Sequence, residues 1–252
     1  MDKKFLSANT LKYIAVIAMT IDHIAFTFIP PESPVYFVMR LFGRLTAPIM
    51  SFFIVEGFLH TKNYRKYFLR MFVFGIISQP FYFVMIFRHT PKNIAEFFMN
   101  LNVMFNFCIS LILLKIVSGK LRTEKKIFLS GMCVMFSDLC DWSIMIPAWV
   151  MVFFFFRNSK FRTMLFISVS VVLITLKFLP MYNNFAEFSY QYGVIMTTVL
   201  ISLYNGRRSQ KLSKLNRWFF YIYYPLHIAV IEILLILIYL YEEIKQNLQK
   251  IP

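Results

Sequence analysis

An ionisable pair inside an apolar stretch is the first place in this chain where chemistry could occur. Asp22 and His23 lie within 11-LKYIAVIAMTIDHIAFTFIP-30, which is long and apolar enough for a transmembrane helix. Ionisable side chains are costly to bury in a bilayer, so those found there usually serve a function. An imidazole can act as a general base or as a nucleophile. We therefore expect His23 to be a catalytic residue, with Asp22 in the same site.

A cation lies on the same helix face as the imidazole. Lys12 precedes His23 by 11 residues, which places the two side chains about 20° apart around a helix and roughly 16 Å apart along it. Such a helix suits a long substrate whose anionic end stays at the membrane boundary while its reactive end reaches inward. The alternative is that Lys12 only anchors the helix at the lipid headgroups and His23 hydrogen-bonds a neighbouring helix.

The next apolar stretch supplies a partner for the buried carboxylate. Arg40 and Arg44 are four residues apart and share a helix face. Adjacent residues project about 100° apart, so we do not expect Asp22 to orient His23. We expect Asp22 to pair with Arg44 instead, and a structural ion pair and a substrate contact both remain open for Arg44.

Polar residues in the other apolar stretches are further candidates for the site. Glu56 lies near the end of the second stretch, and Gln79 precedes Pro80, whose ring frees a backbone carbonyl in mid-membrane. Asn102 could join two helices or line the site. His227 in the last stretch could be catalytic or could cap a cavity.

Composition places the chain in a membrane. Of its 252 residues 59% are hydrophobic and 19% aromatic, above the usual apolar share of soluble domains. The net charge of +15 is explained by basic loops facing an anionic leaflet, so we expect no nucleic-acid partner. The 3 cysteines and 4 histidines show no ligand spacing, so we expect no metal.

Hydropathy and charge predict an all-α, polytopic membrane helix bundle in one domain, 1–252. Nine crossings with a cytoplasmic N-terminus would place 20 Lys and Arg in inner loops and 5 outside. The fifth and sixth stretches are short and share a polar junction at 137–142, so they form either a tight hairpin or a re-entrant pair. The nine stretches are roughly 11–29, 35–60, 67–88, 98–117, 126–140, 142–157, 162–180, 188–205 and 217–241.

A set of short motifs, in order, carries a resemblance to a known family. It runs from L-K-x-I-A and M-T-I-D-H through G-R-x-x-x-P-x-x-x-F-x-x-x-E-G-F-x-x-T, Y-x-x-R and S-Q-P-F to 101-LNVMF-105, the Asp138/Asp141-Trp142 junction, 203-LYNG-206 and 221-YIYYPLH-227. These motifs resemble the TraX family of pilin acetylases from conjugation systems. The resemblance also suggests kinship with larger membrane acyltransferases, namely the acyltransferase-three group and lysosomal heparan acetyltransferase. The Lys12-x10-His23 spacing is similar to that of the first helix in the acyltransferase-three group.

The resemblance implies an enzyme of a bacterial inner membrane, crossing it several times. Its activity would be transfer of an acetyl group from acetyl-CoA, a co-substrate, to the amino terminus of a membrane-embedded pilin or to another extracytoplasmic amine or hydroxyl. His23, Asp22 and Arg44 would form the catalytic group. The CoA phosphates would be held by basic residues at the cytoplasmic ends of the first and third helices: Lys12, Arg70, Arg65 and Lys66.

Two other functions are compatible with the same residues. Buried Asp, His and Arg side chains could form the proton relay of a transporter or flippase, although no inverted repeat is visible. A scaffold within an envelope complex would tolerate substitution at Asp22, His23 and Arg44.

Overall fold

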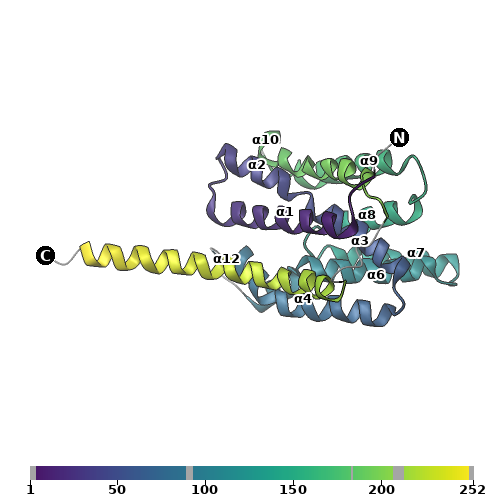
Figure 1. The fold of residues 1–252 in the computed structure, drawn as a ribbon, viewed down its shortest axis with the longest axis horizontal. Coiled ribbons are helices and arrows are strands. Elements are labelled where there is room, and N and C mark those ends of the chain that lie inside the picture. Colours follow the sequence, from purple (N-terminus) through teal and green to yellow (C-terminus); the bar gives the residue numbers. More distant parts are fainter. Residues whose placement is uncertain (1–3, 89–92, 183, 207–212, 250–252) are drawn as a thin grey trace.

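The computed structural model describes residues 4–88, 93–182, 184–206 and 213–249, and within these ranges the chain is built of helices (Figure 1). Two isolated β-bridges, Leu6 with Tyr204 and Leu101 with Cys140, join loops there. The predicted all-α class is confirmed. The elements are α1 (Ala8–Phe28), α2 (Pro34–Gly43), α3 (Thr46–His60), α4 (Tyr64–Ile86), α5 (Ile94–Met99), α6 (Val103–Ser118), α7 (Thr123–Ser137), α8 (Met145–Phe155), α9 (Arg162–Phe178), α10 (Phe185–Phe188), the 3-10 helix η1 (Ser189–Met196), α11 (Thr197–Ser202) and α12 (Ser213–Gln249).

Four segments of the described chain are long and apolar enough to cross a membrane, so the protein is membrane-embedded. They are Ala8–Phe28, Pro34–His60, Tyr64–Ile86 and Trp218–Asn247. The predicted count of nine crossings is not confirmed. The apolar helices α6 and α8 have only 16 and 11 residues, whereas a hydrocarbon layer of about 30 Å needs about 20.

The second of these segments is interrupted where the sequence predicts one continuous helix. α2 ends at Gly43 and α3 begins at Thr46. Pro48 has no N–H to donate to the carbonyl of Arg44 four residues earlier, and its ring would clash with that carbonyl in a continuous helix. The Thr46 hydroxyl donates to the Ala15 carbonyl at 2.9 Å, which ties the interruption to α1.

α7 and α8 are short helices whose connecting turn lies inside the bundle. Their 15 and 11 residues give about 22 and 16 Å of helix, less than a complete crossing. The turn between them is held by hydrogen bonds of 2.7 Å from Leu101 N–H to the Leu139 carbonyl and from Asp141 N–H to the Leu101 carbonyl. Trp142 and Ser143 follow with positive φ angles of 63° and 43°. These lengths favour the re-entrant alternative, which stays a prediction.

The core lies between the helices that surround α3, α6 and α8. Leu11, Ile49, Leu111, Trp149 and Phe166 come from five different helices, and all are 1% exposed or less. The indole N–H of Trp149 donates to the Ser170 hydroxyl at 2.9 Å, which satisfies the one polar atom of this side chain.

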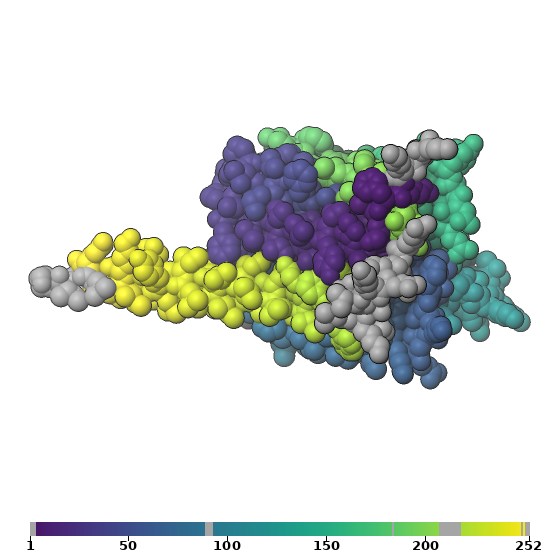
Figure 2. Space-filling view, viewed as in Figure 1, coloured from purple at the N-terminus to yellow at the C-terminus, as the bar shows by residue number. Residues whose placement is uncertain are grey.

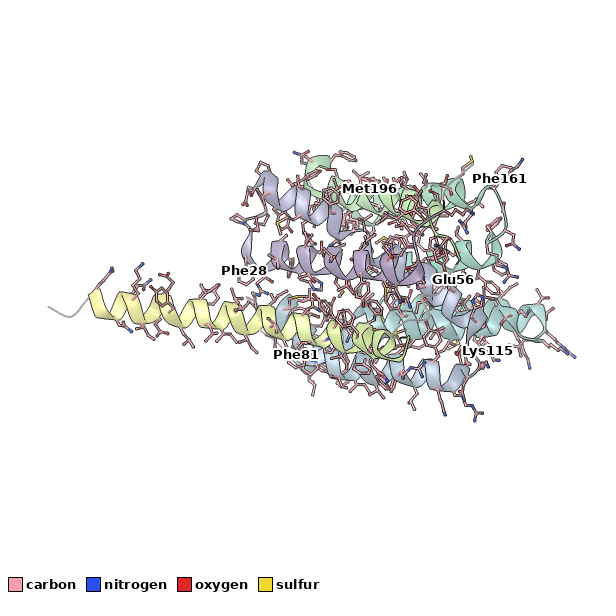
Figure 3. The ribbon with its side chains drawn as sticks, in the orientation of Figure 1. Phe28, Glu56, Phe81, Lys115, Phe161 and Met196 are labelled. Carbon is pink, nitrogen blue, oxygen red and sulfur yellow. The ribbon has the colours of Figure 1, made fainter. Side chains whose placement is uncertain are left out.

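The connections of the bundle separate into two ends. The N-terminal segment and the α3–α4, α6–α7 and α8–α9 connections lie together, and the α1–α2 and α9–α10 connections lie at the opposite end (Figure 1). Figure 3 shows Glu56, Lys115 and Phe161 toward the first end and Phe28 toward the other. The first end carries most of the predicted inner basic residues. Six of the Lys and Arg residues that were assigned to inner or outer loops lie outside the described residues: Lys3, Lys92, Arg207, Arg208, Lys211 and Lys250.

The last helix is longer than the bundle. α12 has 37 residues, and its C-terminal part extends beyond the neighbouring helices (Figures 1 and 2). Leu235, 9% exposed, is its last buried residue within the described part. The first half of α12 lies between α1 and α4 and therefore contributes to the interior of the bundle.

Candidate functional site

A small cavity lies where five segments of the bundle meet, and it contains both residues of the Asp22–His23 pair. Its volume is about 70 Å³, enough for a few water molecules or a small acyl group. The walls come from α1, the α2–α3 interruption, α6, the α7–α8 turn and α12. The lining residues with polar side chains are Asp22, His23, Thr46, Asp141, Trp142 and Tyr224.

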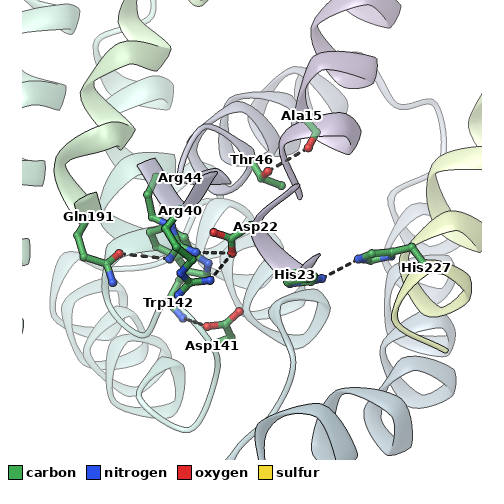
Figure 4. A network of polar contacts seen from close by, with 10 residues as sticks. All are labelled: Ala15, Asp22, His23, Arg40, Arg44, Thr46, Asp141, Trp142, Gln191 and His227. Atoms are coloured by element: carbon green, nitrogen blue, oxygen red, sulfur yellow. Dashed lines mark hydrogen bonds and ion pairs between the residues drawn. The ribbon is translucent and has the colours of Figure 1, made fainter. Parts of the chain in front are cut away.

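The Asp22 carboxylate is paired with two arginines, as Figure 4 shows. Its Oδ2 accepts a hydrogen bond from Arg40 Nη1 at 2.8 Å and another from Arg44 Nη2. Asp22 and Arg44 are each 7% exposed, so the ions neutralise one another away from solvent. The predicted Asp22–Arg44 pair is confirmed. Arg40 was not among the predicted site residues, although its spacing of four from Arg44 was a signal for it.

Arg44 lies behind the cavity wall rather than on it. Its Nη1 donates to Gln191 Oε1 at 3.2 Å, and its guanidinium lies 5.0 Å from the ring centroid of Trp142. Trp142 and Asp141 do line the cavity, and the Trp142 N–H donates to the Asp141 carboxylate at 2.9 Å. The α7–α8 turn therefore connects Arg44 to the cavity.

The His23 imidazole faces away from Asp22 and toward α12. Its Nδ1 lies 2.8 Å from Nε2 of His227, and the two rings are within 6° of parallel with centroids 4.9 Å apart. His227 is buried, and its Nδ1 lies 2.9 Å from the Tyr223 carbonyl oxygen. The expectation that Asp22 does not orient His23 is confirmed, because the partner of His23 is a second histidine 204 residues later in the chain.

Two predicted phosphate-binding residues approach consecutive residues of α12. The Nζ atom of Lys12 lies 5.5 Å from the ring centroid of Phe220, which lines the cavity, and the Arg70 guanidinium lies 5.9 Å from that of Tyr221. Arg65 and Lys66 are exposed at the start of α4. The four basic residues thus lie on α1 and α4 near the basic end of the bundle.

Three other predicted candidates do not line the cavity. Gln79 Oε1 accepts hydrogen bonds from the backbone N–H and the side chain of Asn102 at 2.9 and 2.8 Å. Asn102 also donates to the Gly75 carbonyl at 2.8 Å, so these two residues connect α4 to the α5–α6 junction. Glu56, at the basic end of α3, accepts a long hydrogen bond of 3.5 Å from the Tyr204 hydroxyl.

A metal ion has no candidate ligand group in the described part of the chain. No group of three or more His, Cys, Asp or Glu side chains converges there. The three cysteines are buried and free.

An all-helical membrane protein with ionisable side chains around an internal cavity is the class that the fold and the site define. The family model described as "TraX protein" matches residues 7–235, and the chain belongs to the TraX family. The predicted resemblance to this family is confirmed, whereas similarity to the wider acyltransferase groups stays a prediction.

Two curated relatives extend this finding. "Probable fimbrial assembly protein FimC, serogroup H1" of Dichelobacter nodosus is 32% identical over 231 residues, 89% of this chain and 94% of that protein. An uncharacterized protein of Rickettsia prowazekii (strain Madrid E) is 34% identical over 86 residues, 34% of this chain and 31% of that protein. No solved structure matches the chain.

Proposed function

We propose that this chain is a membrane acyltransferase that moves an acetyl group from cytoplasmic acetyl-CoA to an amine or hydroxyl of a membrane-embedded or extracytoplasmic acceptor. The observation that carries the proposal is the His23 imidazole on the wall of an internal cavity. Within the described residues its Nε2 makes no hydrogen bond, so it is available to a substrate. TraX membership and the relative named for fimbrial assembly support a pilin-like amino terminus as the acceptor.

In the proposed step, His23 is a general base. The acceptor nitrogen or oxygen attacks the thioester carbonyl carbon while Nε2 of His23 takes its proton. The carbon–sulfur bond breaks, the acetyl group stays on the acceptor, and the CoA thiolate leaves with the proton that His23 returns. In the alternative form, His23 first accepts the acetyl group and the acceptor then displaces it.

The arginine–carboxylate cluster sets the charge beside this step. Asp22 holds Arg40 and Arg44 next to the cavity. Arg44 acts through Asp22 and Trp142, because it lies behind both. A positive charge beside a dry site favours the negative charge that develops on a carbonyl oxygen.

The donor would enter from the basic end. A cavity of about 70 Å³ holds an acetyl group and not a pantetheine arm, so the α1–α12 contact must open at Phe220 to admit it. Lys12 and Arg70 lie on either side of this part of α12. With Arg65 and Lys66 nearby, they would hold the CoA phosphates.

The basic end then lies in the cytoplasm of a bacterial cell with this multi-pass protein in its inner membrane. Basic loops remain preferentially on that side of a membrane. The predicted nine crossings would require α7 and α8 to pass completely. A re-entrant hairpin reduces the count to seven and leaves both hairpin ends in the cytoplasm, so the other helices keep their orientation.

The experiment that tests this function is acetyl-CoA binding and turnover by the purified protein in detergent. Wild type and His23→Ala are both expected to bind acetyl-CoA, with thioester turnover lost in the variant by about 10²-fold or more. His60→Ala is the matched control, because His60 is an exposed histidine whose Nδ1 bonds the Glu56 carbonyl of its own helix.

Two results would contradict the proposal. Equal turnover by wild type and His23→Ala at saturating substrate would remove His23 from the mechanism. Absence of binding, together with solute flux into sealed vesicles without acyl-CoA, would favour the transporter or flippase.

A further inference from the structure

The hydrogen bonds of His227 determine which of its nitrogens carries a proton. Nδ1 of His227 lies 2.9 Å from the Tyr223 carbonyl oxygen. A carbonyl oxygen only accepts hydrogen bonds, so Nδ1 of His227 donates. In a neutral imidazole the other nitrogen is then an acceptor, so Nε2 of His227 presents a lone pair.

That lone pair faces His23. The 2.8 Å between Nδ1 of His23 and Nε2 of His227 is a hydrogen-bond distance. Rings 6° from parallel with centroids 4.9 Å apart meet edge to edge, so an N–H in the plane of one ring points at the lone pair of the other. Nδ1 of His23 is therefore the donor, and Nε2 of His23 is left unprotonated.

We propose that His227 is a positioning residue that holds His23 in the Nδ1–H tautomer and so keeps Nε2 of His23 free to take a proton. The inference rests on the proposed function, since a general base needs that lone pair. The hydrogen bond made by one ring nitrogen decides where the proton resides. Without His227, Nδ1 of His23 loses the acceptor that the described part of the chain gives it, and a proton on Nε2 would block the base.

The contact between α1 and α12 holds His227 in place on both sides. One turn toward the basic end, the Thr20 hydroxyl donates to the Val16 carbonyl at 2.9 Å. It therefore accepts from the Tyr223 hydroxyl, 2.7 Å away, on α12. One turn toward the other end, Arg88 bonds Glu232 of α12 and Thr27 of α1. The two helices are thus fixed in register where the histidines meet.

The test is nitrogen NMR of protein labelled with ¹⁵N-histidine. The chain has 4 histidines, so each signal can be assigned by its loss in single His→Gln variants. The expected result is a protonated Nδ1 and an unprotonated Nε2 for His23 in wild type. In His227→Ala the proton of His23 is expected to move to Nε2, with a kcat lower by about 10²-fold and little change in KM.

A conservative variant separates positioning from a structural role. The amide oxygen of His227→Gln can accept from Nδ1 of His23, so this variant should recover part of the tautomer and of the kcat, while His60→Ala should match wild type in both. A wild-type His23 protonated on Nε2 would overturn the proposal. So would a His23 tautomer unchanged in a folded His227→Ala. Because the spectrum is recorded without substrate, a failure of acetyl transfer would be seen separately.

Discussion

At the residue scale, Asp22 and His23 are neighbours in sequence that belong to two different hydrogen-bond networks. Asp22 faces the arginines of the α2–α3 region, and His23 faces α12 (Figure 4). The 100° between adjacent helical side chains makes this separation possible. One helix turn therefore holds a charge cluster on one face and a hydrogen-bonded pair of imidazoles on the next.

The charge cluster predicts a large stability effect for a small change. Asp22→Asn keeps the side-chain shape but leaves Arg40 and Arg44 buried without their shared counter-ion. Removing one partner of a buried ion pair costs about 3–5 kcal/mol, so the variant is expected to unfold at a clearly lower temperature in detergent.

The control for this prediction is a carboxylate in another environment. Glu187→Gln changes an exposed residue of α10 and is expected to leave the unfolding temperature within error of wild type. Equal unfolding temperatures for Asp22→Asn and wild type would show that the arginines do not depend on Asp22.

At the element scale, α1 and α2 approach closely because Gly43 has no side chain. A Cβ placed there would overlap the Asp22 carboxylate. The ion pairs and the helix contact therefore require each other. The interruption between α2 and α3 lies at the same place. Pro48 of α3 cannot donate a hydrogen bond to the Arg44 carbonyl, so the first helical segment ends beside α1.

This contact predicts opposite effects for two Gly→Ala changes. Gly43→Ala forces Asp22 to move and is expected to destabilise the protein by about 1–3 kcal/mol. Gly131 lies in α7, and a Cβ there would meet nothing within 4 Å. Gly131→Ala is expected to be neutral or stabilising by about 1 kcal/mol, since alanine is the better helix former.

Thermal unfolding of both variants in the same detergent measures the difference. An unfolding temperature for Gly43→Ala at or above that of Gly131→Ala would mean that α1 and α2 are not in close contact at this point. Turnover measured on the same samples would show whether a displaced Asp22 also affects the reaction.

At the scale of the whole molecule, the two ends of the bundle differ in charge, and this asymmetry predicts accessibility. Cys108, Cys133 and Cys140 are buried, so introduced thiols are expected to be the reactive ones. Lys62→Cys and Lys120→Cys lie at the basic end, while Glu32→Cys and Glu187→Cys lie at the opposite end; all four positions are exposed.

With the basic end in the cytoplasm, a membrane-impermeant maleimide should label the two glutamate positions in spheroplasts with an intact membrane. The two lysine positions should react only after the membrane is opened. The reverse pattern would invert the proposed orientation, and labelling of all four before opening would contradict a membrane-spanning bundle.

The sequence by itself determined the helical class, the membrane environment and the TraX family, and it indicated Arg44 as the partner of Asp22. Hydrophobic stretches report directly on helices in lipid, and a buried carboxylate requires a cation that only a few positions can supply. The same reasoning could not determine the number of complete crossings. Helix length depends on where proline and the polar turn at 138–144 interrupt the helices. The hydropathy of a whole stretch does not show where those interruptions fall.

Only the tertiary structure decided which polar residues share the cavity. Gln79 and Asn102 were predicted as site residues, but in the structure they join helices. Arg40, Asp141 and Trp142 were not predicted as site residues, but in the structure they lie at the site. His227 meets His23 because α12 returns beside α1, with 204 residues between the two imidazoles. Contacts so distant along the chain depend on how the helices pack, and the spacing within any one helix carries no information about them.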